Sequence, residues 1–286
     1  MSDAYRAALR AARAGSAAAA QIMAGTTATV RENLRLVFGH ADSELVRATY
    51  RHFAAMAVDL TFYRRVFDPA RFEAHFSFVG DGLEHHRAAG GGAAVFATGH
   101  FGNWELFGGA FHHVGIQLAP VARPPGEGWF ARRIDRFRRA QGQELIPKDN
   151  ALPLAMKALK RGKCVAFLMD QAAGRNGVAV PFFGRPAWTF IAPAALALKL
   201  GVPLYAGYST RLGDGIRYRC FAEHVPFDAG EDAIALTARL NGILEGYVRA
   251  CPEQWWWFHK RFKPPRAERR GRPLSAAGVP LEAPVA

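Results

Sequence analysis

The chain has 286 residues, of which 50% are hydrophobic and 21% are charged, and this excludes intrinsic disorder as its main state. Lysine and arginine outnumber aspartate and glutamate by 37 to 24, and the formal net charge of +13 favours an anionic partner: phosphate-bearing lipid, an acidic protein or nucleic acid. The three cysteines, Cys164, Cys220 and Cys251, form neither a disulfide framework nor a zinc pattern, so we expect a reducing compartment.

The amino-terminal region gives no sign of a membrane span. Its longest run without charge extends over residues 14–30 and consists mostly of Ala, Gly, Ser and Thr. Crossing a bilayer takes about 20 strongly apolar residues, so we predict neither a transmembrane helix nor a cleaved signal peptide. We expect residues 1–29 to form an Ala-rich helix that is able to lie on a membrane surface.

Short apolar runs alternate with amphipathic segments along the chain, and each change is marked by glycine, proline or a capping residue. The helical pattern covers residues 3–24, 43–67, 104–113, 129–141, 152–160, 191–200 and 232–250. Strands are expected at residues 93–98, 117–122, 164–169, 203–209 and 216–221. This order predicts an α/β fold, with residues 30–263 forming a single domain whose mixed, mostly parallel sheet is flanked by helices. Residues 264–286 are rich in Pro and Arg, and we predict a disordered tail there.

Two of the predicted strands end next to side chains that can do chemistry. His100 follows the strand at 93–98, and Asp170 follows the strand at 164–169. Ligands of such sheets bind outside the carboxyl ends of the strands, so we expect both residues near a site. Glu105 lies five residues after His100, and the two can meet if His100 occupies the turn before the helix and Glu105 its first turn. A carboxylate there would accept the Nδ1 proton and leave Nε2 as a base, although a histidine that only caps the helix is the competing interpretation.

Motifs for other chemistries are missing from the sequence. It contains no G-x-S-x-G elbow, Walker loop, dinucleotide fingerprint or H-E-x-x-H pair. The doublets His85-His86 and His112-His113 lack companions at metal-ligand spacing, and we expect them on the surface. The remaining hypothesis is that His100 deprotonates a substrate hydroxyl, which attacks directly, without a metal or a covalent enzyme intermediate.

Three further stretches allow two interpretations each. Five arginines between 132 and 139 either clamp phosphate or form a solvated basic face. Phe182 and Phe183 either wall an apolar site or belong to the core. The aromatic and basic residues of 252–263 either meet a membrane interface, or the tryptophans pack under the sheet while the basic residues are solvated.

Taken in order, these motifs resemble the late lipid A acyltransferases, which belong to the glycerolipid and lysophospholipid acyltransferase superfamily. The resemblance covers residues 30–263, and the ordered set is more specific than any one motif. The motifs that carry it are Asn33-Leu34-Arg35-Leu36-Val37-Phe38, His100-x4-Glu105, Asp170-Gln171, Pro181-Phe182-Phe183-Gly184, Pro252-Glu253-Gln254-Trp255 and His259-Lys260-Arg261.

The resemblance implies O-acyl transfer from an acyl thioester, on acyl carrier protein or coenzyme A, to a hydroxyl of a membrane lipid, lipid A-like or other. It implies that His100 is the general base and Glu105 its orienting partner, with no metal and no further cofactor. The substrate-binding residues that we predict with it are Arg138, Asp170, Gln171, Asn103 and Arg123. The expected partners are acyl carrier protein, the lipid acceptor and an anionic membrane surface. The expected location is cytoplasmic, peripheral on the inner face of the bacterial inner membrane.

Two other functions are left open by the residues alone. An esterase or thioesterase would use the same histidine and carboxylate with water as the acceptor. A nucleic-acid or membrane-binding module would use only the positive charge, but the arginines are not interleaved with aromatics as in nucleic-acid motifs, so we expect no nucleic-acid partner.

Overall fold

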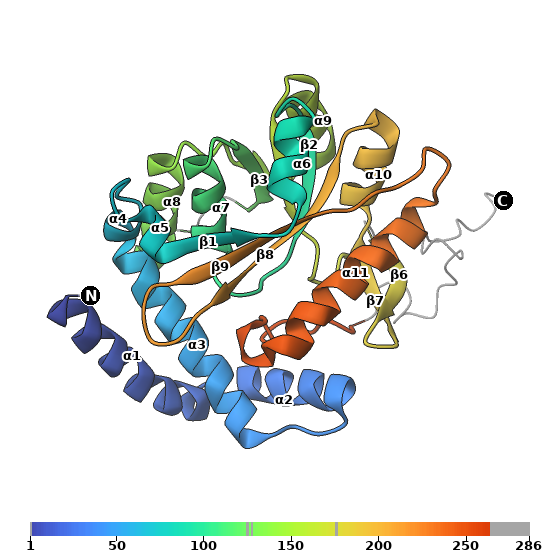
Figure 1. The fold of residues 1–286 in the computed structure, drawn as a ribbon. Helices are drawn as coiled ribbons and strands as arrows, with labels where there is room; N and C mark the ends of the chain where they lie inside the picture. The colour runs from blue at the N-terminus through green and yellow to red at the C-terminus, as the bar shows by residue number, and fades with distance from the viewer. Residues whose placement is uncertain (1, 124–125, 127, 175–176, 264–286) are drawn as a thin grey trace.

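A seven-stranded sheet forms the centre of the molecule in the computed structural model, which describes residues 2–123, 126, 128–174 and 177–263 (Figure 1). The strand order is β1-β9-β8-β2-β5-β3-β4, and every pair is parallel except β8 with β9. The predicted single-domain α/β fold with a mixed, mostly parallel sheet is therefore confirmed. The strands are β1 (Phe76–Val79), β2 (Ala94–Thr98), β3 (Leu118–Ala122), β4 (Ile146–Pro147), β5 (Cys164–Leu168), β8 (Leu204–Arg211) and β9 (Tyr218–His224).

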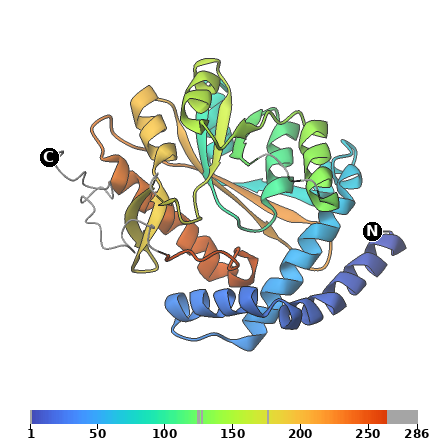
Figure 2. The ribbon, with the colours of Figure 1, turned by 180° about the vertical axis from the view of Figure 1, so that it is seen from behind.

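Helices cover both faces of this sheet (Figures 1 and 2). The core cluster on one face draws on α2 (Ala24–Phe38), α9 (Ala151–Lys160), α10 (Ala192–Leu200) and α11 (Ala233–Ala250). The core cluster on the other face draws on α1 (Asp3–Ile22), α3 (Ser43–Thr61), α6 (Gly82–Ala88), α7 (Trp104–His113) and α8 (Trp129–Ala140). The short helices α4 (Tyr63–Val66) and α5 (Phe72–His75) follow α3. Among the described helices, none combines the length and the apolar character that crossing a bilayer requires.

The buried strand β2 explains why the sequence signal was clear at the centre of the sheet. Its side chains alternate between the two core clusters, with Val95 and Ala97 on one face and Ala94 and Phe96 on the other. A strand buried on both faces appears in sequence as an uninterrupted apolar run, which is how 93–98 and 164–169 were identified.

The predicted ranges do not include β1, β4, α5 and α6, most of α2, or a separate hairpin. Helix α2 begins with Gly and three Thr residues among its first six positions, and packing of Val30 and Leu34 in the core outweighs their low helix propensity. A separate antiparallel hairpin is made by β6 (Gly177–Phe182) and β7 (Arg185–Phe190). Its turn places Phe183 at φ 51°, which is rare for a phenylalanine, and Gly184 at φ 69°, so Gly184 is the residue that marks the turn in the sequence. Phe182 and Phe183 are both buried in the core, so the core interpretation is correct for them.

Helix α1 is fixed to the rest of the fold by a buried polar network. Tyr5 and Leu9 are buried, and the Tyr5 hydroxyl donates to Oδ1 of Asp59 on α3 at 2.8 Å. Arg211 of β8 donates to the other oxygen of Asp59 at 2.8 Å and to the Tyr5 hydroxyl at 2.9 Å. Helix α1 thus packs against α3, and α2 runs across position 30 without a break. The tail predicted at 264–286 lies outside the described residues.

We predict that Asp59→Ala lowers the free energy of unfolding by about 3–5 kcal/mol, because it leaves the buried Arg211 guanidinium without its carboxylate. Urea denaturation followed by circular dichroism measures this difference. Arg139→Ala is the control, since it breaks an ion pair with Asp135 whose arginine is 79% exposed, and the expected change is below about 1 kcal/mol. Equal losses in the two variants would contradict a stabilising role for the network.

Candidate active site

His100 and Asp170 meet at the carboxyl ends of two adjacent parallel strands. Thr98 of β2 is in register with Leu168 of β5, so the residues that follow these strands emerge side by side. Nδ1 of His100 lies 2.7 Å from Oδ1 of Asp170. A carboxylate can only accept, so Nδ1 carries the proton and Nε2 is the nitrogen available for chemistry. The imidazole side chain is 20% exposed while that of Asp170 is 1% exposed, and the pair is therefore accessible only from the histidine side.

Two glycines allow the backbone to bring the pair together. A Cβ atom on Gly102, which has φ 61°, would lie 1.7 Å from the carbonyl oxygen of Ser209. A Cβ on Gly99 would lie 3.0 Å from Oδ2 of Asp170. The turn from 99 to 103 therefore needs glycine at both positions, for space at 99 and for space and positive φ at 102.

The buried Asp170 carboxylate is held ionised by its neighbours. Burial alone would raise its pKa, but attraction to His100 and three hydrogen bonds outweigh burial and lower the pKa below its ordinary value of 3.8. The donors are Nδ1 of His100, the backbone N–H of His100 at 2.7 Å and the indole N–H of Trp255 at 2.8 Å. Asp170 is thus a charged partner that can stabilise an imidazolium on His100.

Glu105 does not occupy the position predicted for it. Its carboxylate accepts two hydrogen bonds from the Arg138 guanidinium, at 2.8 Å and 2.6 Å, and one from the Trp104 indole at 3.1 Å. Asp170 takes the place at Nδ1, so the expectation that Glu105 accepts that proton is wrong in this structure. The reason is geometric: Glu105 lies in the first turn of α7 and turns toward α8, where Arg138 lies. Burial opposes the charge of Arg138, but Glu105 outweighs it and raises the pKa of the guanidinium.

The other predicted substrate-binding residues are placed differently from one another. Arg123 is exposed just after β3, at the same sheet edge as Asp170, and Gln171 is partly buried next to Asp170. Asn103 is completely buried, and its side chain caps α7 at Leu106 and donates to the hydroxyl of Tyr218. Asn103 therefore shapes the turn, and the expectation that it contacts a substrate is not met in this structure. Arg138 is engaged by Glu105 as described above.

The C-terminal segment, residues 251–263, contributes to the site in a way that the sequence analysis missed. Trp256 donates its backbone N–H to the carbonyl of His100 at 2.9 Å, and Gly102 donates to the carbonyl of Gln254 at 2.8 Å. Nε2 of His259 accepts from the backbone N–H of Ala172 at 3.0 Å. The segment thus binds both the turn that carries His100 and the loop that carries Asp170.

Burial of this segment decides between the two interpretations of its aromatic and basic residues, namely contact with a membrane interface and packing in the core. Trp255, Trp257 and Arg261 are all buried, so they are not available to a membrane interface. Arg261 donates to the carbonyl of Trp188 at 2.8 Å and to the hydroxyl of Thr189 at 2.6 Å. Packing under the sheet is the correct interpretation for the two tryptophans, while Arg261 is buried rather than solvated.

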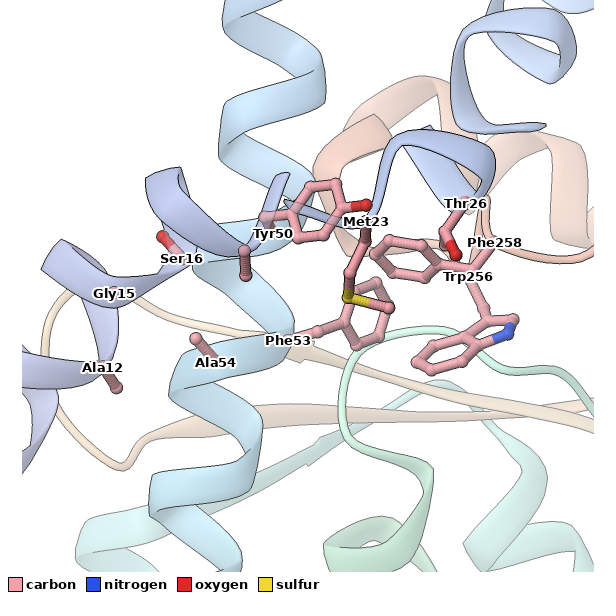
Figure 3. A pocket seen from close by; sticks show the side chains of 11 residues that line it. Ala12, Gly15, Ser16, Met23, Thr26, Tyr50, Phe53, Ala54, Trp256 and Phe258 are labelled. Atoms are coloured by element: carbon pink, nitrogen blue, oxygen red, sulfur yellow. The ribbon is translucent and has the colours of Figure 1, made fainter. Parts of the chain in front are cut away.

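An apolar cavity of about 370 Å³ (Figure 3) is lined in part by Trp256, the residue whose backbone N–H binds the carbonyl of His100. It opens between α1, α2, α3 and the C-terminal segment, with Tyr50, Phe53, Trp256 and Phe258 as its aromatic wall. The ring of Trp104 connects it to the site: its centroid lies 4.9 Å from that of His100 and 5.7 Å from that of Trp256. The volume falls within the range of about 300–1,000 Å³ that is usual for ligand pockets.

Because the pKa of Asp170 is lowered in the folded protein, the free energy of unfolding should depend on pH in the acidic range. A carboxyl with a depressed folded-state pKa stabilises the fold above its unfolded pKa, and this contribution is lost as the pH falls through the folded-state value. We therefore expect wild type to exceed Asp170→Asn in free energy of unfolding at pH 5, by a margin that shrinks below about pH 4. Denaturant unfolding of both proteins, at pH 5 and at several pH values below 4, measures the margin. A margin that grows on acidification would contradict this assignment.

Comparisons with known proteins show the family to which the chain belongs. Residues 4–264 match the family described as bacterial lipid A biosynthesis acyltransferase. A phosphatidylinositol mannoside acyltransferase of Mycobacterium tuberculosis is 28% identical over 187 residues, covering 61% of this chain and 56% of that protein. The lipid A biosynthesis palmitoleoyltransferase of Escherichia coli is 28% identical over 243 residues, 82% of this chain and 77% of that protein. The lipid A biosynthesis lauroyltransferase of Escherichia coli is 33% identical over 113 residues, 38% of this chain and 36% of that protein. The chain thus spans little more than half the length of the mycobacterial relative.

Proposed function

The chain belongs to the bacterial lipid A biosynthesis acyltransferase family, and on this basis we propose that it transfers a fatty acyl group to a hydroxyl of a membrane lipid. The proposed donor is an acyl thioester on acyl carrier protein or coenzyme A, and the acceptor is lipid A-like or another membrane lipid. The observation that carries the proposal is the hydrogen bond between His100 and Asp170, which leaves one imidazole nitrogen for a substrate at the edge of the sheet.

In the proposed reaction, Nε2 of His100 accepts the proton of the acceptor hydroxyl, and the hydroxyl oxygen attacks the thioester carbonyl. The ionised Asp170 stabilises the imidazolium that forms, as a buried carboxylate at Nδ1 can. When the tetrahedral intermediate collapses, the carbon–sulfur bond breaks and the imidazolium returns the proton to the leaving thiolate. The products are an ester and a free thiol, and His100 is neutral again.

The basic surface of α8 supports an acidic donor protein. Arg132, Arg136 and Arg139 are exposed on this helix, while Arg138 of the same helix is bound to Glu105 beside the site. Charge of this kind steers an acidic partner such as acyl carrier protein toward the surface and speeds its association. We propose that Glu105 acts through this pair with Arg138, by fixing α8 against α7.

The apolar cavity supports a fatty acyl substrate. Its lining is almost entirely hydrocarbon and aromatic, and its lining residue Trp256 contacts Trp104, which in turn contacts the ring of His100. We propose that the acyl chain lies there while the thioester carbonyl faces Nε2.

The junction of α1 and α2 supports contact with a membrane. Ile22 is 81% exposed and Met23 is 48% exposed, and Met23 also lines the cavity. An apolar tip on a chain of net charge +13 suits peripheral binding to an anionic bilayer. The proposed location is therefore peripheral, on the inner face of the bacterial inner membrane.

We predict that His100→Ala lowers the rate of acyl transfer about 10²- to 10⁴-fold, the usual range for loss of a general base. The assay uses purified protein, acyl carrier protein or coenzyme A thioesters, and a panel of lipid hydroxyl acceptors, with products identified by mass spectrometry. If the protein hydrolyses the thioester and added lipid acceptors do not suppress this hydrolysis, the protein is a thioesterase and the proposed acyl transfer is wrong. Unchanged transfer in the variant would overturn the role of His100.

Filling the cavity should shorten the acyl chain that is accepted. Gly15 lines the cavity, and a Cβ built on it meets no atom within 4 Å, so Gly15→Leu places its side chain in open space. We expect kcat/KM for the longest donors to fall about tenfold while shorter donors are little affected. Gly25→Leu is the matched control, because it is equally free of contacts but lies outside the cavity lining. The same chain-length profile in both variants would contradict the proposed position of the acyl chain.

A further inference from the structure

Trp255 makes a polar contact that packing does not require. Its ring is 1% exposed and lies against Phe182 and Trp257, with centroids 5.3 Å and 4.5 Å away. Its indole N–H donates to Oδ2 of Asp170 at 2.8 Å. A buried indole N–H needs an acceptor, but here the acceptor is the charged partner of the histidine.

This contact fixes the rotation of the Asp170 carboxylate. Oδ1 faces Nδ1 of His100, and Oδ2 receives the Trp255 indole together with the backbone N–H of His100. Both donors of the His100 residue belong to the turn that the carboxylate itself orients. Trp255 is the donor from outside that turn, since it comes from a segment 85 residues further along the chain than Asp170.

The backbone around Trp255 holds the same turn from the other side. Trp255 forms an antiparallel bridge with Phe101, and its neighbours Gln254 and Trp256 bind Gly102 and His100 through backbone hydrogen bonds. One short stretch of chain therefore contacts the base through its backbone and the acid through its indole. The two reacting groups are positioned against a common support.

From this geometry we propose that Trp255 is a positioning residue: its indole N–H holds Asp170 in the orientation that points Oδ1 at Nδ1 of His100. The inference rests on the proposed function, because it assigns to Trp255 a part in the His100-dependent transfer. Trp255 does not touch substrate, so its effect falls on the rate of the chemical step rather than on substrate binding.

Trp257 provides a matched control in the same segment. It is also fully buried, and its indole N–H donates to a backbone carbonyl, that of Pro252, at 2.6 Å. Trp257→Phe and Trp255→Phe thus remove the same chemical group from equally buried rings. Only Trp255→Phe removes it from Asp170.

The experiment compares these two variants with wild type in steady-state acyl transfer and in urea unfolding. We expect both variants to lose similar stability. We expect kcat of Trp255→Phe to fall about tenfold or more, as for loss of a hydrogen bond to a charged group, with KM for both substrates within about twofold. Trp257→Phe should keep kcat within about twofold of wild type. Equal kcat values in the two variants would overturn the proposal.

A measurement without substrate separates this inference from the proposed function. The proton on Nδ1 of His100, shared with a carboxylate, should give a far-downfield proton NMR signal that is absent in His100→Ala. We expect the signal to be shifted or lost to solvent exchange in Trp255→Phe and kept in Trp257→Phe. If the signals behave in this way but no acyl transfer is found, the proposed function fails and the positioning role stands. An unchanged signal in Trp255→Phe rejects the positioning role.

A closer isostere covers the case in which Trp255→Phe does not fold. Benzothienylalanine replaces the indole N–H by sulfur and keeps the bicyclic shape. Because Cys251 precedes Trp255, a synthetic peptide of residues 251–286 carrying this residue can be ligated to residues 1–250 to give the full chain. The same fall in kcat and the same change in the NMR signal are expected, and their absence in this folded protein would reject the proposal.

Discussion

The site depends on the parallel pairing of β2 with β5, because that register brings two strand ends together. Thr98 stands opposite Leu168, so the turn after β2 and the loop after β5 leave the sheet at the same height. Ala94, Val95, Phe96 and Ala97 are all buried, and moving the register by one residue would exchange the side chains between the two core clusters. Core packing thus fixes the register that brings His100 and Asp170 within hydrogen-bond distance.

Burial and charge are balanced differently around the two carboxylates of the site. Asp170 accepts hydrogen bonds from a partly exposed imidazole and from neutral N–H groups. Its negative charge can therefore stabilise a protonated His100. Both oxygens of the Glu105 carboxylate accept hydrogen bonds from the Arg138 guanidinium, whose permanent positive charge balances the charge of Glu105. Glu105 is therefore not available to bind His100. Burial lowers the pKa of the nearby Arg261 to about 10, although the charge of Asp170 opposes that effect. The carboxylate that meets a titratable partner suits catalysis, and the one that meets arginine suits structure.

The sequence predicted the fold and the residues of the site better than it predicted their pairing. His100 and Asp170 were found because each follows a fully buried strand, and such strands are visible as apolar runs. Glu105 was assigned to His100 because local spacing is all that a sequence displays, whereas Asp170 reaches the ring from 70 residues away through sheet register. Trp255 belongs to one of the motifs that carry the resemblance, but its contact with Asp170 could not be predicted, since an indole that binds a carboxylate and one that only packs look the same in a sequence.

The His100 ring contacts polar groups of one part of the fold and an aromatic ring of another. The Nδ1 side of the ring is held by the buried Asp170 carboxylate, and the C-terminal segment binds the backbone carbonyl of His100. The ring also lies edge-on to Trp104, which leads toward an apolar cavity bounded by the amino-terminal helices. The C-terminal segment thus holds the turn that carries His100, and the amino-terminal helices bound the apolar cavity nearby. These segments lie at opposite ends of the described chain. An apolar cavity two rings away from a histidine that is held by a buried carboxylate is the arrangement on which the proposed transfer of a fatty acyl group depends.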